Sequence, residues 1–328
     1  MKTIAFFNNK GGVGKTTLVY HLAWMFAGMG RRVLVADLDP QANLTSMFLA
    51  ESELEKLWDP DREEHPSIMA PLSPMTRGLG DIGETPTQRI TNAIWLIPGD
   101  LALSNFESNL SEAWGKCLDG QEPAFRTTSA FHRVMLDAYQ KTDADVVLID
   151  VGPNFGAINR AALICAESVV VPLAPDLFSI QGLRNLGPTL KDWRTQWKRR
   201  FAENPAIDLP LPKGMMNPVG YTVIQFGIRD SRPVKAYQKW SNRIPSTFDS
   251  LVLENPKEDI SKTYENDPNC LGMLKHYRSL MPMAMEARKP IFNLSAADGA
   301  IGAHAKSVQD CKDDFKNLAK NILAKYKF

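Results

Sequence analysis

Cysteine is scarce in this sequence, and its few cysteines have no metal-binding spacing. The four cysteines among 328 residues lie far apart without a C-x-x-C pair, and the five histidines do not stand at zinc-ligand spacings. We therefore expect a reduced, cytosolic chain without a structural metal. The sequence also lacks a run of about 18 apolar residues and a basic segment before a long apolar stretch, so we expect neither a membrane-spanning helix nor a signal peptide.

An excess of either charge is also missing. Lys and Arg number 38 and Asp and Glu number 37, which gives a formal net charge of +1. Any attraction to nucleic acid or to anionic lipid must then come from a local patch. Hydrophobic residues make up 44% and charged residues 23%, which excludes a disordered, collagenous or coiled-coil chain.

Short apolar runs alternate with stretches of helical period, as in a parallel sheet with crossover helices. The runs are 3–7, 33–36, 94–97, 146–149, 169–173 and 221–226. In the first helix Leu18, Leu22 and Phe26 share an apolar face, and Gly30 supplies a C-terminal stop. We predict a doubly wound, mostly parallel α/β fold.

Three stretches interrupt this alternation. Residues 60–86 and 204–218 are rich in Pro, and 254–269 is polar. We predict one domain over 1–328 with surface insertions at these places. These insertions either determine binding specificity or are surface loops without a function of their own, and the sequence leaves both possibilities open.

The most informative segment lies between the first strand and the first helix. It reads Asn8, Asn9, Lys10, Gly11, Gly12, Val13, Gly14, Lys15, Thr16, Thr17. Glycines let consecutive backbone N–H groups turn toward one anion, and the helix N-terminus adds partial positive charge. We expect Lys15 to reach the β- and γ-phosphates of a nucleotide, Thr16 to bind Mg²⁺ and Thr17 to contact the α-phosphate.

A strict G-x-x-x-x-G-K-[ST] motif would have Gly where Asn9 stands, and a second lysine, Lys10, is present. The segment resembles the deviant Walker A motif, K-G-G-x-G-K-[ST], of the ParA/MinD family, most closely in its ParA/Soj-type members. The resemblance implies a P-loop ATPase with ATP and Mg²⁺ as cofactors. It also implies that Lys10 reaches the partner's phosphates in a homodimer that forms on ATP binding.

The resemblance continues in two segments with carboxylates. Residues 37–43 are similar to the family's switch I, D-x-D-P-Q-x-N, which implies that Asp39 orients the attacking water and that Asp37 supports the Mg²⁺ shell. The apolar strand 146–149 ends in Asp150, as a Walker B element needs. Thr16, Asp39 and Asp150 are thus the expected metal residues.

The segment 151–156 is similar to the family's switch II, D-x-P-P-x-x-G, with Gly152 in place of the first proline. Asn159 stands where the family commonly has Thr, and Ala161 where it commonly has Asn. The coupling of the switch segments is therefore expected to differ from that in the family. Further landmarks lie at 94–99, 171–172, 181–183 and 286–291, and the family's adenine contacts correspond to Gln225 and Phe226.

The resemblance implies a slow ATPase that binds DNA nonspecifically as an ATP dimer. A ParB-like or other partner protein would stimulate hydrolysis. The cycle would partition or position DNA or other cargo in the bacterial cytoplasm, where the protein would be associated with the nucleoid. Basic residues at helical spacing could contact phosphates, although such rows are also common on solvated helix faces. They are Lys191, Arg194 and Lys198, followed by Arg199 and Arg200, and in a second row Lys235, Lys239 and Arg243.

Two alternatives remain. A MinD-like protein would bind membrane through an amphipathic tail, and residues 315–327 have an apolar and a basic face. ParA-type proteins also end in a helix packed on the sheet, so we expect no membrane attachment. The other alternative is a nucleotide-gated scaffold or regulator with little turnover.

Overall fold

The chain passes more than once between two units. The computed structural model describes residues 1–59, 61, 66–226, 228–229, 232–233, 240–255, 263–277 and 279–326, with the backbone alone at 225–226, 228–229 and 232–233. The first unit comprises Met1–Phe7, Ala27–Val169 and Leu190–Asn217, and the second comprises Asn8–Phe26, Val170–Thr189 and Pro218–Phe328. The expectation of one ATPase domain over the whole chain stays a prediction.

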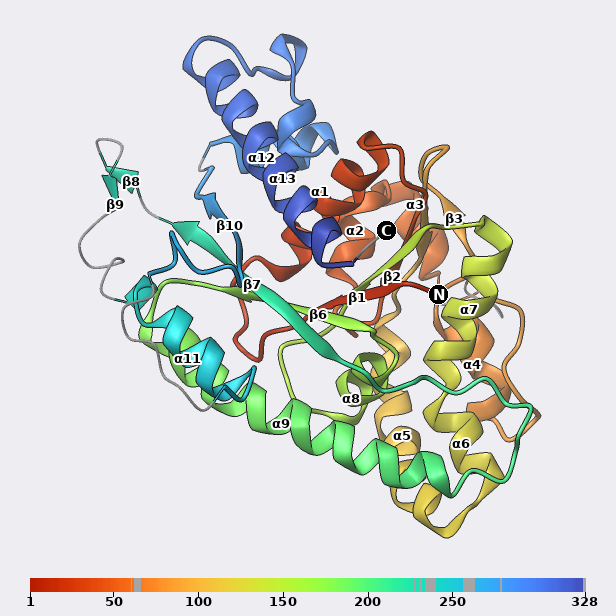
Figure 1. Cartoon of the computed structure of the whole chain (residues 1–328). Helices are drawn as coiled ribbons and strands as arrows, with labels where there is room; N and C mark the ends of the chain where they lie inside the picture. Colours follow the sequence, from red (N-terminus) through yellow and green to blue (C-terminus); the bar gives the residue numbers. More distant parts are fainter. Residues whose placement is uncertain are drawn as a thin grey trace. The chain divides into compact units, whose positions relative to one another are not determined.

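Parallel strands form the centre of the first unit (Figure 1). Their order is β1 (Thr3–Phe6), β5 (Val146–Asp150), β2 (Val33–Asp37) and β4 (Ile94–Ile97), and β3 (Gln88–Arg89) adds an antiparallel edge. Every residue of β1, β2 and β5 is buried. Such strands are continuous apolar runs because helices cover both faces of a parallel sheet.

The helices of the first unit surround these strands. They are α2 (Asn43–Phe48), α3 (Glu51–Leu57), α4 (Met69–Thr76), η1 (Leu101–Phe106), α5 (Glu107–Lys116), η2 (Cys117–Asp119), α6 (Glu122–Thr128), α7 (Ala130–Thr142), α8 (Ala157–Ile164) and the second half of α9 (Leu177–Ala202). Helix α7 packs on β2 and β5, and α5 packs against α6 and α8.

The second unit has its own strands and helices. Strand β6 (Ser168–Leu173) enters it from the first unit, next to β7 (Asn217–Phe226), which pairs in parallel with β10 (Cys270–Lys275). The other elements are α1 (Lys15–Gly28), the first half of α9, β8 (Ile228–Arg229), β9 (Arg232–Pro233), α11 (Ile244–Leu251), α12 (Leu280–Ala287), η3 (Ile291–Asn293), η4 (Ala296–Asp298) and α13 (Ala303–Tyr326). Helix α13 packs on β10, where Gly272 lets Leu318 approach closely.

The predicted fold class is confirmed: the protein is an α/β protein with mostly parallel strands and flanking helices. All six predicted strands are present at the expected places. The first helix ends at Gly28, and Gly30 follows it with a left-handed φ of 81°, as a C-terminal stop requires. β10 was not predicted from the sequence, because Gly272 interrupts its short apolar run.

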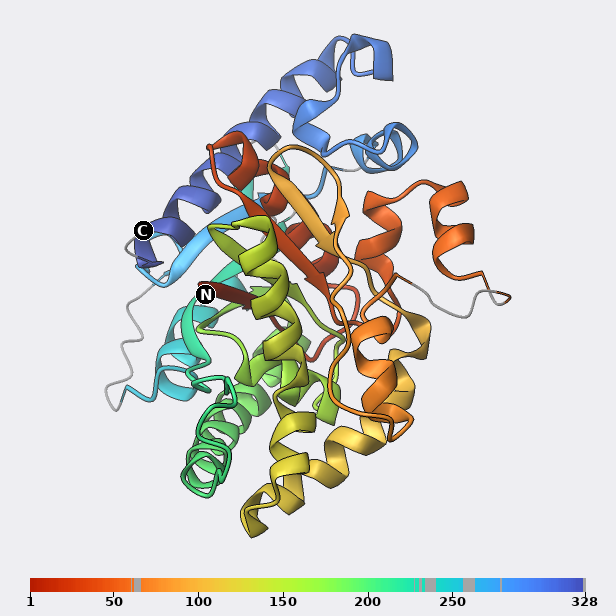
Figure 2. The same cartoon turned by 90° about the vertical axis from the view of Figure 1, so that its right-hand side faces the viewer.

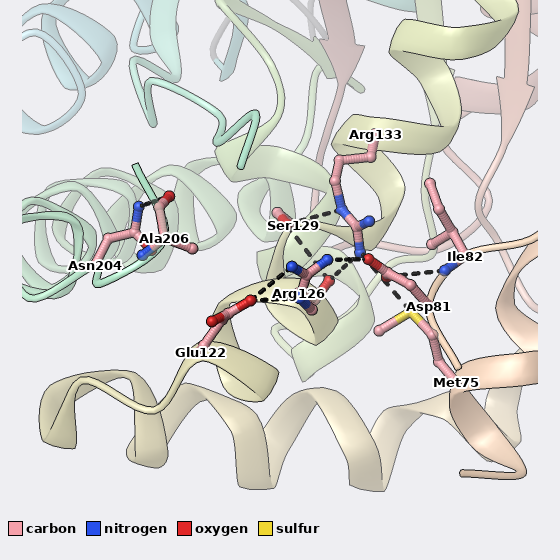
Figure 3. A network of polar contacts seen from close by, with 9 residues as sticks. All are labelled: Met75, Asp81, Ile82, Glu122, Arg126, Ser129, Arg133, Asn204 and Ala206. Carbon is pink, nitrogen blue, oxygen red and sulfur yellow. Dashed lines mark hydrogen bonds and ion pairs between the residues drawn. The ribbon is translucent and has the colours of Figure 1, made fainter. Parts of the chain in front are cut away.

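The segment 66–86 is more than a surface loop. It contains α4, and both Ile68 and Leu72 are fully buried in the first unit. In Figure 2 this orange segment lies beside the yellow helices of the same unit. Beyond α4 the chain is held by Asp81, whose carboxylate accepts hydrogen bonds from Arg126 and from Arg133, the latter at 2.7 Å (Figure 3).

The other two expected insertions are also attached to their units. In 204–218, Gly214 has a left-handed φ of 64°, and a Cβ there would lie 2.2 Å from the Trp197 ring. In the described part of 254–269, Asp267 accepts a 2.8 Å hydrogen bond from the Tyr221 hydroxyl. That these stretches are insertions stays a prediction.

We expect Asp81→Asn to destabilise the protein by about 1–2 kcal/mol at neutral pH, because Arg133 is buried and loses its charged partner. Burial alone would raise the pKa of Asp81, but hydrogen bonds from Arg133, the Ile82 N–H and Arg126 together lower it. The contribution is therefore present above the unfolded pKa of about 3.9 and is lost as the pH falls below it.

Urea unfolding of both proteins between pH 7 and pH 3 measures this difference. The matched control is Asp137→Asn, which breaks an exposed pair with Lys141 on α7 and is expected to cost less than about 0.5 kcal/mol. An equal loss of stability in the two variants would show that the Asp81 network does not anchor the segment.

Candidate functional site

The glycine-rich segment forms a turn that leads into α1 in the second unit. Gly12 and Gly14 have left-handed φ values of 73° and 84°. A Cβ at Gly12 would meet nothing within 4 Å, so the backbone conformation rather than space requires glycine there. Helix α1 begins at Lys15, and the Leu18 N–H donates to the Gly14 carbonyl at 2.9 Å. The first N–H groups of the helix therefore follow directly on the turn, as an anion site requires.

The side chains of this loop differ in exposure. Lys15 is only 7% exposed, and Val13 is buried beneath the turn. Thr16 and Thr17 are half-buried, and Gly11 is exposed. The long side chain of Lys15 is therefore held close to the protein at the start of α1, where a phosphate would be bound.

Lys10 lies at the rim of the loop and contacts its own chain. Its ammonium group pairs with the Asp176 carboxylate and lies 5.6 Å from the centroid of the exposed Phe178 ring. Asp176 also accepts a 2.8 Å hydrogen bond from the Ser179 N–H in the first turn of α9. Sequence reasoning missed Asp176, although Asp directly before the first residue of a helix is a common N-cap.

The loop is fixed to β6 and α9 within the second unit. The Asn8 side chain donates to the Pro172 carbonyl at 2.7 Å and accepts from the Lys10 N–H at 3.0 Å. A Cβ at Gly182 would lie 2.9 Å from the Asn9 Oδ1 atom. Gly182, one of the landmarks in the sequence, therefore allows α9 to approach the loop closely.

A cavity of about 310 Å³ adjoins the loop in the same unit. Gly14 and Thr17 line one end, and its walls are largely apolar, with Ile224, Leu274 and Phe315 among them. The predicted adenine contacts Gln225 and Phe226 follow Ile224 at the end of β7, but their side chains lie outside the described residues. Their role stays a prediction.

His21, in the wall of this cavity, is neutral, and both of its ring nitrogens make hydrogen bonds. Its Nε2 atom accepts from the Ile291 N–H at 3.1 Å, so Nδ1 carries the proton and donates to the Thr17 carbonyl at 2.7 Å. The ring stacks on Phe315 with a centroid distance of 4.9 Å. Burial lowers the pKa of His21 to about 4. His21 therefore joins α1 to the chain near η3 and α13.

The first unit gathers carboxylates at the ends of its parallel strands. Asp37 ends β2 and Asp150 ends β5, and the two are partners in the strand register. Asp37 accepts hydrogen bonds from the Thr45 N–H at 2.8 Å and the Thr45 hydroxyl at 2.7 Å. Burial, followed by the charge of Asp150, raises the pKa of Asp37 to about 7, although the bonds from Thr45 oppose the shift.

Asp39 follows in a tight turn. It is 5% exposed, its Oδ1 atom accepts from the Gln41 N–H at 3.0 Å, and its carbonyl accepts from the Ala42 N–H at 2.8 Å. A Cβ at Gly152 would lie 3.4 Å from Asp39 Oδ1. The structure therefore brings the predicted switch I carboxylate next to the first residues of the predicted switch II.

Sequence reasoning missed two residues around Asp37. The Thr45 hydroxyl, which donates to Asp37, also accepts a hydrogen bond from the Gly99 N–H at 2.7 Å. A Cβ at Gly99 would lie 2.8 Å from the Asp37 carboxyl carbon. The I-P-G landmark at 97–99 was visible in the sequence, but its contact with Asp37 was not.

No group of three or more His, Cys, Asp or Glu side chains in the described part of the chain is arranged to hold a metal ion alone. Mg²⁺ in phosphate sites takes only one or two protein ligands, so such a group is not required for it. In the first unit the buried carboxylates Asp39 and Asp150 are hard oxygen donors, and in the second unit the half-buried Thr16 carries a hydroxyl at the start of α1. Their joint binding of Mg²⁺ stays a prediction.

The first basic row lies on the solvent side of α9, in the first unit. Lys191 and Lys198 are exposed, whereas Trp193 and Trp197 on the other side are buried. Arg194 is half-buried and donates to the Met216 carbonyl at 3.1 Å. Lys235 and Lys239 of the second row lie outside the described residues.

Arg200 does not extend this basic row, contrary to the sequence-based expectation. It is 6% exposed, its Nε–H donates to the Trp114 carbonyl at 2.6 Å, and its guanidinium stacks 4.3 Å from the centre of the Trp114 ring. Helical spacing alone could not reveal this, because α5 supplies the partner.

The C-terminal helix uses its apolar side inside the second unit. The side chains of Phe315, Leu318 and Ile322 are buried. Across the described residues, no helix combines the length and the apolar character that crossing a membrane requires. The apolar side is therefore occupied by the protein's own packing.

Known proteins resemble this chain in sequence and in fold. A family model described as an AAA domain matches residues 1–203. The chromosome-partitioning ATPase Soj of Thermus thermophilus is 30% identical over 194 residues, which are 59% of this chain and 63% of that protein. The partitioning protein ParA of Caulobacter vibrioides is 28% identical over 211 residues, 64% of this chain and 67% of that protein.

A crystal structure of a Corynebacterium diphtheriae protein superposes with a TM-score of 0.72 and 26% identity, covering 99% of this chain and 98% of that one. Several curated relatives are longer, and the matched part spans only 42% to 56% of their length. The family match covers more than half of the chain. This protein therefore belongs to the AAA-domain family matched here, and it is similar to partitioning proteins of the ParA/Soj type.

Proposed function

We propose that this protein is an ATP-dependent, dimerising ATPase that binds DNA without sequence preference and partitions or positions DNA or other cargo. The observation that carries the proposal is the placement of two lysines in one phosphate loop. Lys15 is buried at the start of α1, whereas Lys10 is at the rim and paired with Asp176. Lys15 would thus serve the nucleotide bound by its own chain, and Lys10 would serve the nucleotide bound by a neighbouring chain.

The phosphate loop and the carboxylates would serve one nucleotide. The turn and the first N–H groups of α1 would bind the phosphates, and Lys15 would neutralise their charge. The cavity beside Gly14 and Thr17 would hold the base and ribose, since apolar walls favour a purine ring.

Hydrolysis would depend on positioning and charge compensation. Bound Mg²⁺ would compensate phosphate charge, with Thr16, Asp39 and Asp150 as its expected protein neighbours. Asp39 would orient the attacking water, and its fixed turn supports this role because the carboxylate is held in place. Asp37 would support these groups from beneath, held by Thr45.

Dimerisation on ATP would require Lys10 to leave Asp176 for the partner's phosphates. A phosphate chain carries more negative charge than one carboxylate, so ATP on the partner can compete for Lys10. This exchange would make the dimer depend on nucleotide. A partner protein, ParB-like or other, would then stimulate hydrolysis and release.

DNA is favoured over membrane as the surface on which the dimer acts. Lys191 and Lys198 are exposed on α9, and phosphate contact needs only such accessible cations. The amphipathic tail that membrane binding would need has its apolar side buried in α13 packing. A nucleotide-gated scaffold with little turnover remains the second candidate. The exchange of Lys10 from Asp176 to a partner's phosphates would be enough to make the dimer depend on bound nucleotide, without hydrolysis.

We expect Lys15→Ala and Lys10→Ala to fail at different steps. Loss of Lys15 should weaken ADP and ATP binding at least about 100-fold, because it removes the buried cation at the phosphates. Loss of Lys10 should leave ADP affinity within about threefold but abolish the ATP dimer. Calorimetry measures binding, and analytical ultracentrifugation with ATP measures the dimer; a normal dimer in Lys10→Ala would refute its action across the interface.

We expect Asp39→Ala to bind ATP, dimerise and hydrolyse it at least about 100-fold more slowly, because the water is no longer oriented. Hydrolysis at the wild-type rate would show that another group orients the water. The trapped protein should bind random-sequence duplex DNA, and this binding should weaken steeply with salt.

The same protein is tested on anionic liposomes, with ADP as the control in both assays. Liposome binding without DNA binding would assign the protein to the membrane class. Binding to neither would favour the gated scaffold.

We expect Lys191→Glu with Lys198→Glu to lower DNA affinity at least about tenfold and to reduce the salt dependence, because phosphate contacts are lost. Arg194 is left unchanged, since it holds the Met216 carbonyl. The matched control is Lys316→Glu with Lys320→Glu, the same charge change on the exposed side of α13. Equal DNA binding by the two double variants, measured by fluorescence anisotropy, would make the α9 row an ordinary solvated face.

A further inference from the structure

A carboxylate from α5 holds the first turn of α8 in the first unit. The Glu107 carboxylate accepts hydrogen bonds from the Ala157 N–H and, at 2.9 Å, from the Ile158 N–H. These are the first two residues of α8, whose N–H groups have no partner within the helix. A negative charge at this end also interacts favourably with the helix dipole. Glu107 thus fixes the point at which the loop after Asp150 enters α8.

Gly156 is required for this contact by space and not by backbone conformation. Its φ of −70° and ψ of 176° are accessible to any residue. A Cβ there would lie 2.8 Å from Glu107 Oε1 and 2.9 Å from Asn154 Oδ1. The glycine that ends the predicted switch II segment therefore leaves room for the Glu107 carboxylate.

Asn159 holds the same loop from within α8. Its side-chain amide donates to the Gly152 carbonyl at 2.8 Å and to the Asn154 carbonyl at 2.7 Å. Asn159 is one of the positions at which this sequence departs from the family pattern. Glu107 fixes the α8 end of the loop from outside, and Asn159 ties the loop's carbonyls to the helix.

The loop also makes an aromatic contact toward each side. The Phe155 ring meets the Phe7 ring edge to face at 5.6 Å and the Trp193 ring at 6.0 Å. Phe7 directly precedes the phosphate loop in the chain, and Trp193 lies on α9 between Lys191 and Lys198. The ring of Phe155 therefore packs the loop against Phe7, directly after β1, and against α9 within the first unit.

We propose that Glu107 is the positioning residue for switch II in this protein, setting where residues 151–156 stand for hydrolysis. The inference rests on the proposed function and deepens it. Glu107 fixes the α8 end of the loop, while Asn159 and the ring of Phe155 hold the residues before it. Glu107 does not touch the nucleotide and acts only through the loop.

The test compares Glu107→Gln with Glu112→Gln. Both remove one negative charge from α5, but Glu112 is exposed and pairs with Lys116 one turn away. Hydrogen exchange monitored by mass spectrometry measures protection of peptides across 152–158. Turnover with ATP and random-sequence DNA gives kcat and KM, and calorimetry gives ADP affinity.

We expect Glu107→Gln to raise exchange in 152–158 about tenfold and to lower kcat by a similar factor, with KM and ADP affinity within about twofold. Glu112→Gln should match the wild-type protein in every measurement. Glu107→Asp, which is too short to reach both N–H groups, should behave like Glu107→Gln.

Faster exchange with unchanged kcat would make Glu107 a structural cap only and would overturn the proposal. Unchanged exchange would overturn it as well, because the loop would then be held without Glu107. Absence of turnover in the wild-type protein would reject the proposed hydrolysis instead, and the exchange comparison would still decide whether Glu107 holds the loop.

Discussion

The phosphate loop depends on one constraint, namely that consecutive backbone N–H groups must face a single anion. This requires left-handed backbone at Gly12 and Gly14, which side chains resist, and a helix that starts directly behind the turn. The neighbouring contacts serve this geometry. Asn8 ties the loop to β6, and Gly182 leaves room for Asn9 beneath α9. A rigid loop costs no reorganisation when a phosphate binds.

The two carboxylate segments are held by contacts within the first unit. Asp37 is held by Thr45, and Asp39 is held by its own turn, so both carboxylates have a fixed orientation. The loop after Asp150 is tied at its far end by Glu107, and Asn159 holds the Gly152 and Asn154 carbonyls along its length.

Helix α9 has two different ends. Its first turn is capped by Asp176, which also pairs with Lys10, and its second half carries exposed lysines above buried tryptophans. The same helix is thus connected with the lysine that the proposed dimer needs and with the surface that the proposed DNA contact needs. Arg194 and Arg200 show that the charge of a residue does not establish its role, since both donate to backbone carbonyls instead.

Local sequence was sufficient for the strands, for α1 and for the phosphate loop. Buried parallel strands appear as apolar runs, and a glycine turn before a helix has a recognisable spacing. The strand ends also located Asp37 and Asp150, because a carboxylate that follows an apolar run stands at the edge of the sheet. β10 was missed because Gly272 breaks the short apolar run on which such predictions depend.

Tertiary structure alone decided which distant side chains meet. Asp176 lies 166 residues from Lys10, Glu107 lies 50 residues from Ala157, and Asp81 meets Arg126 and Arg133 only because the segment 66–86 folds back on α6 and α7. No local pattern encodes these pairs, since each depends on how separate elements pack. The sequence therefore determined the fold class and the phosphate loop, whereas packing determined what holds Lys10, switch II and the basic face of α9.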